Sequence, residues 1–261
     1  MARLFLFLII IGGCKNNIIF SLSEIKQLTV DGDNGEAYFS SDNKHLVFQS
    51  KRGGDECDKI YTMTIDGMNI QRLAVTDGAF TCSYYSLDDK IIFFSSTLHD
   101  GPDCPEVYKH PNPHKYIWPL RNFEIYSVDK NDKLKKLTHF SGYNAEATAH
   151  PLEKKIIFTS LRDGDIDLYE MNYDGKQVTR ITKEYGYDGG AFYSPDGKKL
   201  VWRGWHPETE AEKKQWNENL TNRYIEAVPL DIYVANRDGS NKIRLTRNGA
   251  TNWAPSWHPN G

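Results

Sequence analysis

The sequence predicts an all-β fold, a β-propeller of four-stranded antiparallel blades. Three observations predict it: a motif of about 44 residues recurs along the chain, polar turns divide each copy into short segments, and β-branched and aromatic residues fill these segments. Because turn residues interrupt the chain about every ten positions, the pattern excludes long helices as the main structure.

Each repeat contains an aromatic-rich segment, a polar turn, a strongly apolar segment, a segment with Ile-Tyr or Leu-Tyr, an Asp-Gly turn and a closing segment. The clearest copy has Gly189–Tyr193, the turn Ser194–Gly197 and the apolar Lys199–Trp202, and it resumes at Asp231–Val234. Asp-Gly and Pro-Asp-Gly are typical of tight turns between antiparallel strands.

The spacing of the closing segments gives the size of the repeat. Their apolar residues are separated by 45, 64, 44 and 64 positions and are Leu28, Leu73, Leu137, Ile181 and Leu245. A unit of about 44 residues with four strands is typical of a propeller blade. We expect four full blades and partial ones, as part of a propeller of six or more blades that continues beyond Gly261.

The two longer repeats predict insertions at 97–122 and 205–230, each between the second and third strands of its blade. In an antiparallel blade, the turn after strand two lies at the same end as the connection between blades. Both insertions therefore lie on one face, which we call the insertion face. Since binding residues are often on long loops held by a rigid frame, we expect binding on this face.

The second insertion has a helical pattern. Thr209 and Glu212 have capping-box spacing, and Trp216, Leu220 and Tyr224 follow at one helical face. This apolar face either docks on its own blade or binds a partner. The first insertion is rich in proline, which indicates an ordered loop rather than a helix.

Acidic and aromatic residues of the connections between blades are candidates for the central mouth of the propeller. They provide either a binding surface or the hydrogen bonds between blades that every propeller needs. Together with Trp216, the predicted binding residues are Glu36, Tyr143, Glu146, Tyr187, Asp188 and Trp253.

The first fourteen residues predict export. Arg3 precedes an apolar run, Leu4–Ile11, that is too short to span a bilayer as a helix, and Gly12 and Gly13 lead to Cys14. This is typical of a signal peptide and resembles a bacterial lipobox, in which the cysteine carries lipid. A plain signal peptide and an uncleaved anchor remain alternatives. We expect 1–14 to be the signal, 15–23 a tether and 24–261 the propeller of a periplasmic or outer-membrane-associated lipoprotein, held to the membrane only by lipid on Cys14.

Three further cysteines, Cys57, Cys82 and Cys104, map near one rim of the predicted propeller. In an exported protein they allow one disulfide and one free thiol. Three separate thiols or a metal site are the alternatives, although the spacing is not that of a zinc site.

The sequence carries no nucleophile elbow, zinc-protease motif or phosphate-binding glycine loop. We therefore expect no catalytic residue, metal or cofactor. The net charge of −3 and the lack of a basic run predict no nucleic-acid partner. Asp163–Asp167 suggests either a structural turn or a calcium loop. Four histidines of the insertions are either surface residues or metal ligands: His99, His110, His114 and His206.

The segments Tyr193–Trp202, Asp231–Ser240 and Arg244–Thr246 resemble the repeat of TolB-like propellers, a WD-repeat-like class. The resemblance covers nearly everything from Glu24 to Gly261. It implies a propeller, usually of six blades. From export and the insertion face we expect a scaffold of the cell envelope that binds a protein partner through that face. As alternatives the resemblance implies the propeller of a metal-dependent enzyme similar to oligogalacturonate lyase, or that of a prolyl-oligopeptidase-like peptidase.

Overall fold

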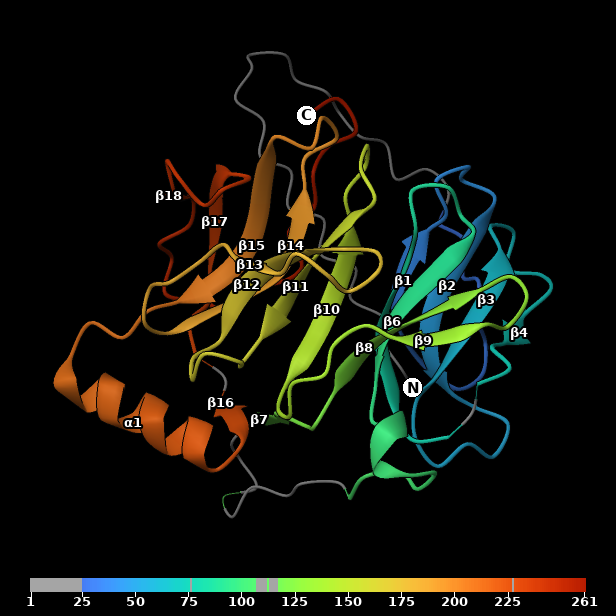
Figure 1. The fold of residues 1–261 in the computed structure, drawn as a ribbon, viewed down its shortest axis with the longest axis horizontal. Helices are drawn as coiled ribbons and strands as arrows, with labels where there is room; N and C mark the ends of the chain where they lie inside the picture. The colour runs from blue at the N-terminus through green and yellow to red at the C-terminus, as the bar shows by residue number, and fades with distance from the viewer. Residues whose placement is uncertain (1–24, 76, 107–111, 113–116, 227) are drawn as a thin grey trace.

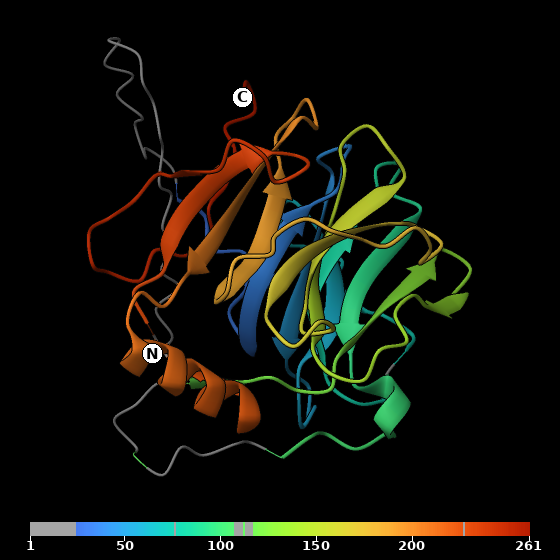
Figure 2. The same ribbon diagram turned by 60° about the vertical axis from the view of Figure 1, so that its left-hand side comes forward.

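A computed structural model describes residues 25–75, 77–106, 112, 117–226 and 228–261. It confirms the predicted fold, because the chain forms four antiparallel four-stranded blades arranged as a propeller. The blades lie side by side with their first strands toward a common centre (Figures 1 and 2). The signal, Cys14 and the tether at 15–23 lie outside the described residues, as do His110 and His114.

The blades follow the order of the repeats, each pairing its strands in sequence order. Blade 1 consists of β1 (Asp33–Phe39), β2 (His45–Lys51), β3 (Lys59–Thr64) and β4 (Gln71–Arg72). Blade 2 consists of β5 (Phe80–Tyr85), β6 (Ile91–Ser96), β8 (Glu124–Asp129) and β9 (Leu134–Lys136). Blade 3 consists of β10 (Asn144–Ala149), β11 (Lys155–Ser160), β12 (Asp167–Asn172) and β13 (Thr179–Arg180). Blade 4 consists of β14 (Tyr187–Tyr193), β15 (Lys199–Trp205), β17 (Asp231–Asn236) and β18 (Ile243–Arg244).

The apolar second segment and the Tyr-containing third segment of each repeat meet in the blade core. In every blade an aromatic residue of strand two lies directly opposite a tyrosine of strand three, with ring centroids 5.8–5.9 Å apart. These cross-strand pairs are Phe48–Tyr61, Phe94–Tyr126, Phe158–Tyr169 and Trp202–Tyr233. Such pairs stabilise a sheet beyond the area they bury, which is why the repeat needs its aromatic residues at these positions.

The first strand of every blade has the same β-bulge. The pairing with strand two shifts at this point in all four blades. The bulged residues all have positive φ, between 48° and 62°, and are Glu36, Cys82, Glu146 and Gly190. Ala254, at the same place in the fifth repeat, has φ 49°. Bulges bend a strand and redirect side chains, so the fold directs one residue of each repeat toward the centre.

The two insertions meet on one face, at the bottom of Figure 1. Strand β7 (Ile117–Pro119) of the first pairs antiparallel with β16 (Tyr224–Glu226) of the second. The resulting ribbon joins blades 2 and 4, which are not neighbours in the sequence. The opposite face, which we call the turn face, carries the turns after β1, β5, β10 and β14.

The second insertion contains the predicted helix, α1 (Glu210–Thr221), and both bonds of the capping box at Thr209 are present. The expectation that Tyr224 lies on the same helical face was wrong. The helix ends at Asn222, Arg223 adopts a positive φ of 60°, and Tyr224 begins β16. The first insertion has only a short 3-10 turn, η1 (Leu98–Asp100), and β7 in its described part. No helix of the described residues is both long and apolar enough to cross a membrane.

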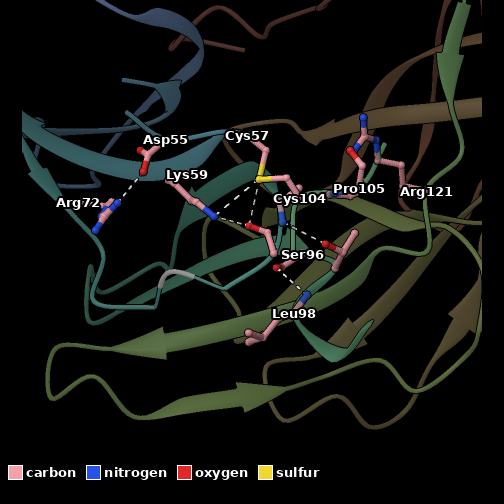
Figure 3. Close-up of a disulfide and its surroundings, with 12 residues drawn as sticks. Asp55, Cys57, Lys59, Arg72, Ser96, Leu98, Cys104, Pro105 and Arg121 are labelled. Atoms are coloured by element: carbon pink, nitrogen blue, oxygen red, sulfur yellow. Dashed lines mark hydrogen bonds and ion pairs between the residues drawn. A yellow bond between two sulfur atoms is a disulfide. The ribbon is translucent and has the colours of Figure 1, made fainter. Parts of the chain in front are cut away.

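A disulfide joins Cys57, just before β3, to Cys104 in the first insertion (Figure 3). It connects blade 1 to the insertion of blade 2, across 47 positions of sequence. On the other side of the same segment, Arg121 donates to the carbonyl of Pro105 at 3.3 Å. The disulfide therefore fixes the first insertion to blade 1, and the bond from Arg121, itself part of the insertion, closes the segment on itself. Cys82 keeps its thiol; it does not lie at this rim, because the bulge of β5 turns it toward the centre.

Candidate functional site

The predicted mouth residues divide into two groups in the structure. Glu36, Tyr143, Glu146, Tyr187 and Trp253 lie around Arg203, in the channel between the first strands. Asp188 and Trp216 lie elsewhere, in the interior of blade 4 and under helix α1. Glu36, Tyr187 and Glu146 lie within the inner strands or at their ends rather than in connections between blades.

Arg203 organises the residues of the channel. We call the following set, which Trp253 borders, the channel cluster: Glu36, Cys82, Tyr143, Glu146, Tyr187 and Arg203. The Arg203 guanidinium donates to Glu146 and lies 3.9 Å from the centroid of the Trp253 ring and 5.7 Å from that of Tyr187. Burial by itself lowers the pKa of Arg203, but the charge of Glu146 and the contact with Tyr187 outweigh it, so the pKa is raised. The cluster thus holds one permanent positive charge.

Gly190 is the bulged residue that lets Arg203 occupy this place. A Cβ at Gly190 would lie 1.8 Å from the Arg203 guanidinium, and its φ is +62°. In the other three blades no arginine of strand two packs against the bulged residue, so that residue can be glutamate or cysteine. Glycine here is therefore required by the close approach of the guanidinium and not by the backbone conformation, which Glu36, Cys82 and Glu146 also adopt.

Two groups of the cluster, the Glu36 carboxyl and the Cys82 thiol, have a raised pKa and are shifted toward their neutral forms. Desolvation, with the nearby charge of Glu146, raises the pKa of Glu36, although its side chain still reaches water in the channel. Burial, followed by the charges of Glu36 and Glu146, raises the pKa of Cys82 well above its usual value. A thiol held neutral is a poor nucleophile, so the cluster is not arranged for thiolate chemistry.

Part of the cluster forms hydrogen bonds between blades, the second of the two roles predicted for the mouth. Thr159 of β11 donates to Glu146 at 2.7 Å and accepts from the backbone of Gly190 at 3.1 Å. In blade 1, Gln49 accepts from the backbone of Cys82 at 3.1 Å. In both blades, the residue that follows the aromatic residue of strand two therefore bonds to the bulged residue of the next blade. These residues are Thr159 after Phe158 and Gln49 after Phe48.

Trp216 anchors helix α1 to the propeller. It is 1% exposed, its indole donates to Asp165 at 2.9 Å, and it packs 5.7 Å from Trp205. It belongs to the apolar cluster that also contains Leu120 and Ile225 from the two insertions. The apolar side of α1 therefore docks on its own propeller, as one of the two predicted alternatives had it.

The Asp163–Asp167 turn uses its carboxylates for structural bonds. Asp165 accepts from Trp216 and from the backbone of Ile166 and Gly186. Asp167 accepts from Arg180 at 2.6 Å and Asp163 from the Tyr169 hydroxyl at 2.7 Å. Within the described part of the chain, no three acidic, histidine or cysteine side chains lie close enough together to hold a metal ion.

Asp188 and His206 form a buried pair in blade 4. Asp188 accepts from the Trp202 indole at 2.6 Å and lies 3.4 Å from Nε2 of His206. Nδ1 of the same ring lies 3.2 Å from the carbonyl of Tyr185, so both ring nitrogens face acceptors. His206 occupies the place that Arg52 and Arg162 hold in blades 1 and 3, directly after strand two and beside the first strand.

His150 has the opposite environment. Its Nδ1 accepts from the backbone of Leu152 and Glu153, and Nε2 faces the carbonyl of Gly197 at 3.2 Å. This pattern requires a neutral ring that carries its proton on Nε2. Burial, helped by the charge of Arg237, lowers the pKa of His150. For His206, burial also acts to lower the pKa, but the hydrogen bond and charge of Asp188 prevail and raise it.

The two histidines are expected to give stability of opposite pH dependence. The contribution of His206 is fully present below the ordinary pKa of about 6.5 and is lost as the pH rises through its higher folded value. That of His150 is present above about 6.5 and is lost as the pH falls through its lower folded value. The measurement is urea unfolding of His206→Gln and His150→Gln between pH 5.5 and 8.5. Relative to the unsubstituted protein, the destabilisation should shrink with rising pH in the first variant and grow in the second; parallel slopes would contradict both assignments.

Several residues of the site escaped the sequence prediction, above all Arg203, Cys82 and Trp118. Trp118 of β7 packs edge-on against Trp253 at 5.3 Å and Tyr187 at 6.0 Å. The position of the bulge could have been predicted from the sequence. In every repeat the bulged residue stands four positions before the serine or histidine that begins the turn between strands one and two. Arg203 could also have been noticed, because it is a charged residue in the interior of a strand whose other charged residue, Lys199, stands at its start.

Exposure limits which predicted residues can touch a partner. Tyr143, Tyr187, Asp188 and Trp216 are all at most 8% exposed and support the face from within. Trp253 is 41% exposed and Glu36 also reaches water. Helix α1 adds polar side chains such as Lys214 and Glu218, which are 80% and 53% exposed.

Comparison of the sequence with known proteins finds a distant relative. No family model matches the sequence. An uncharacterized protein of Agrobacterium fabrum is 26% identical over 251 residues, which cover 85% of this chain and 80% of that protein.

Comparison with solved structures identifies the fold. A protein assigned as TolB from Agrobacterium tumefaciens matches with a TM-score of 0.61 and 20% identity over 85% of this chain and 69% of that one. TolB from Acinetobacter baumannii matches with a TM-score of 0.59 and 18% identity over 82% of this chain and 44% of that one. An oligogalacturonate lyase from Vibrio parahaemolyticus matches with a TM-score of 0.53 and 14% identity over 84% and 55%. The chain therefore has the TolB-like β-propeller fold.

Proposed function

We propose that this protein is an exported propeller scaffold of the bacterial cell envelope that binds a protein partner through its insertion face. The observation that carries the proposal is the pairing of β7 with β16. It joins the insertions of blades 2 and 4 into one platform beside the channel mouth, fixed by the disulfide and by buried Trp216. A preformed surface loses less conformational entropy on binding than separate loops do.

The proposed contact surface consists of the outer side of α1 and the exposed mouth residues Trp253 and Glu36. The helix surface is polar and carries both charges, with Lys214 and Glu218 one turn apart. Trp253 supplies a partly exposed aromatic ring, and aromatic residues are enriched at the centres of protein interfaces. The surface thus combines an aromatic centre with a charged border, a common arrangement in transient interfaces.

Export is supported by the disulfide between Cys57 and Cys104, because such bonds persist in oxidising compartments. We extend a cell-envelope location to this chain from the TolB proteins that share its fold. We further propose that lipid on Cys14 anchors the protein at a membrane.

The insertion face is tested with a photocrosslinking amino acid at Lys214 in living cells, with Asp238 on the turn face as the matched exposed position. We expect a discrete crosslinked product at Lys214 and none at Asp238, and we expect Glu218→Lys to weaken the Lys214 product several-fold. Substitution is preferred to deletion of the helix, because Trp216 belongs to the core. Products only at Asp238, or none at either position, would contradict the assignment of the face.

The same cells test the anchor independently. Cys14→Ser is expected to release the protein from the membrane fraction or to block its processing, whereas Cys82→Ser should leave fractionation unchanged. An unchanged fractionation and processing of Cys14→Ser would count against lipidation.

A further inference from the structure

A cavity opens on the turn face, at the end of the propeller away from the insertions. Its volume is about 430 Å³, within the range of small-molecule sites. It is lined by the ends of the first strands and the following turns of all four blades, together with Ser256 and Trp257. The aromatic residues around it are Phe39, Tyr84, Tyr85, Phe192, Tyr193 and Trp257.

The lining carries no formal charge. None of its residues is Asp, Glu, Lys or Arg, and its imidazole, His150, is held neutral by the two backbone N–H groups that donate to Nδ1. Its polar residues are hydroxyl- and amide-bearing instead, among them Ser41, Asn43 and Thr148. A charged ligand would lose its hydration here without gaining an opposite charge, so the lining favours a neutral one.

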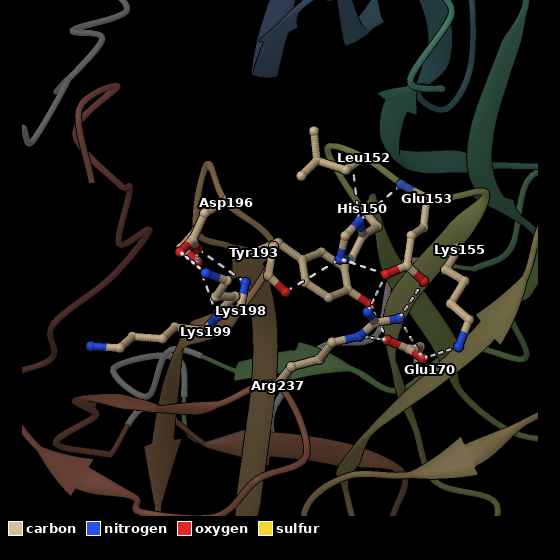
Figure 4. Close-up of polar contacts among 12 residues, drawn as sticks. His150, Leu152, Glu153, Lys155, Glu170, Tyr193, Asp196, Lys198, Lys199 and Arg237 are labelled. Carbon is tan, nitrogen blue, oxygen red and sulfur yellow. Dashed lines mark hydrogen bonds and ion pairs between the residues drawn. The ribbon is translucent and has the colours of Figure 1, made fainter.

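Charged residues behind the wall residue Tyr193 form a hydrogen-bonded network outside the cavity (Figure 4). On the side of blade 1, Asp42 accepts from the lining residue Ser40 and Asp89 accepts from the backbone of Ser41. Arg237 donates to Glu170 at 2.6 Å and to Glu153 at 2.6 and 3.0 Å. Glu170 in turn accepts from the Tyr193 hydroxyl at 2.9 Å. The wall residue Tyr193 is therefore fixed from outside the cavity.

His150 completes this rigid wall. Its ring packs edge-on against Tyr193 with centroids 4.6 Å apart, and both residues are at most 8% exposed. A Cβ at Gly197 would lie 2.3 Å from the His150 ring, so the turn of blade 4 closes directly over it. Wall groups held in this way are preorganised for a ligand.

Other groups of the lining have unused hydrogen-bonding capacity. Tyr84 packs against Tyr38 at 5.2 Å and Phe192 at 6.3 Å through its ring. Among the described residues, neither its hydroxyl nor the side-chain amide of Asn43 makes a hydrogen bond. Both are left to a ligand or to water.

We propose that this cavity is a binding site for a neutral saccharide. The carbon-bound hydrogens on one side of a sugar ring carry partial positive charge and pack well on the negative face of an aromatic ring. Sugar hydroxyls pair with neutral amides and hydroxyls, the polar groups present here. A peptide with charged side chains would find no partner in this lining, and an acidic sugar would find none for its carboxylate.

The experiment is isothermal titration of the purified protein with cellobiose, maltose and diacetylchitobiose. We expect at least one to bind saturably with a Kd of about 1 mM or lower, and digalacturonate to bind at least about ten-fold more weakly. Trp257→Ala and Tyr84→Ala should each weaken binding about ten-fold or more. Tyr84→Phe, which retains the ring, should weaken it only a few-fold.

The controls separate the cavity from the rest of the molecule. Tyr185→Ala removes an exposed tyrosine beside α1, on the other face, and should not change binding. Asn43→Gly removes the amide while keeping the positive φ of 56°, so it tests the cavity even if Tyr84→Ala fails to fold. It should weaken binding a few-fold.

Three results would overturn the proposal. These are the absence of saturable binding by all three neutral disaccharides, tighter binding of digalacturonate or of the blocked peptide acetyl-Phe-Pro-amide, or neutral-sugar binding unchanged in Trp257→Ala and Asn43→Gly. None of them bears on crosslinking at Lys214, so failure of the saccharide site is distinguishable from failure of the proposed scaffold function.

Discussion

Arg203→Met is expected to lower the free energy of unfolding by about 3–5 kcal/mol. Arg203 is 6% exposed, and its guanidinium is the charged partner of Glu146 in the channel. Methionine fills a similar volume but leaves the Glu146 carboxylate with Thr159 as its remaining side-chain donor, near the acidic Glu36. Removing one member of a buried ion pair leaves an uncompensated charge, and this sets the size of the loss. Urea unfolding followed by fluorescence measures it.

Two further variants test the cause of this loss. Lys213→Met removes a pair with Glu210 at 2.7 Å whose side chains are 43% and 89% exposed, so it should cost much less stability than Arg203→Met. The double variant Arg203→Met/Glu146→Gln should recover part of the stability, since no buried charge remains. If Arg203→Met costs no more than Lys213→Met, the channel cluster does not stabilise the propeller through its ion pair.

Trp216→Ala is expected to lower the free energy of unfolding by about 3–5 kcal/mol. The substitution leaves a cavity in the apolar cluster shared by both insertions and removes the indole that donates to Asp165. Alanine favours helix, so an intrinsic loss of helix propensity cannot explain the result. Hydrogen exchange should also quicken in β7, which belongs to the other insertion but pairs with β16 at the end of the α1 segment.

Matched variants again separate the contributions. Trp216→Phe keeps an aromatic ring without the N–H group, so we expect a loss of about 1–3 kcal/mol from the missing indole donor to the Asp165 carboxylate, which keeps its backbone donors Ile166 and Gly186. Lys214→Ala lies on the same helix with 80% of its side chain exposed and should change stability by less than about 0.5 kcal/mol. Unchanged exchange in β7 of Trp216→Ala would show that the two insertions are not one cooperative unit.

Local sequence chemistry was enough to predict the blades. The turns Asp66-Gly67, Asp174-Gly175 and Asp238-Gly239 place positive φ where a tight turn requires it. The alternation of apolar segments with these turns gave strand number and order. The capping box of Thr209 and Glu212 likewise predicted where α1 begins, because its two bonds join residues only three positions apart.

The candidate site was only partly predictable, since a binding surface depends on exposure. Tyr187 and Trp253 have similar residue types and repeat positions near the mouth, yet one is 1% and the other 41% exposed. Both rings pack against Trp118 and Arg203, which come from other parts of the chain, but Tyr187 also belongs to the apolar cluster that contains Trp216. The turn-face cavity is likewise formed by segments more than forty residues apart, each with an ordinary aromatic strand end.

The sequence by itself determined the repeat, the strand order and the face on which both insertions lie, because these follow from turn chemistry and from the period of two along a strand. Only the tertiary structure decided that Cys57 pairs with Cys104, that Cys82 and Arg203 enter the channel, and that β7 pairs with β16. The physical reason is that these contacts join separate blades. Their formation depends on how each blade bends and packs beside its neighbour, which local residue patterns do not encode.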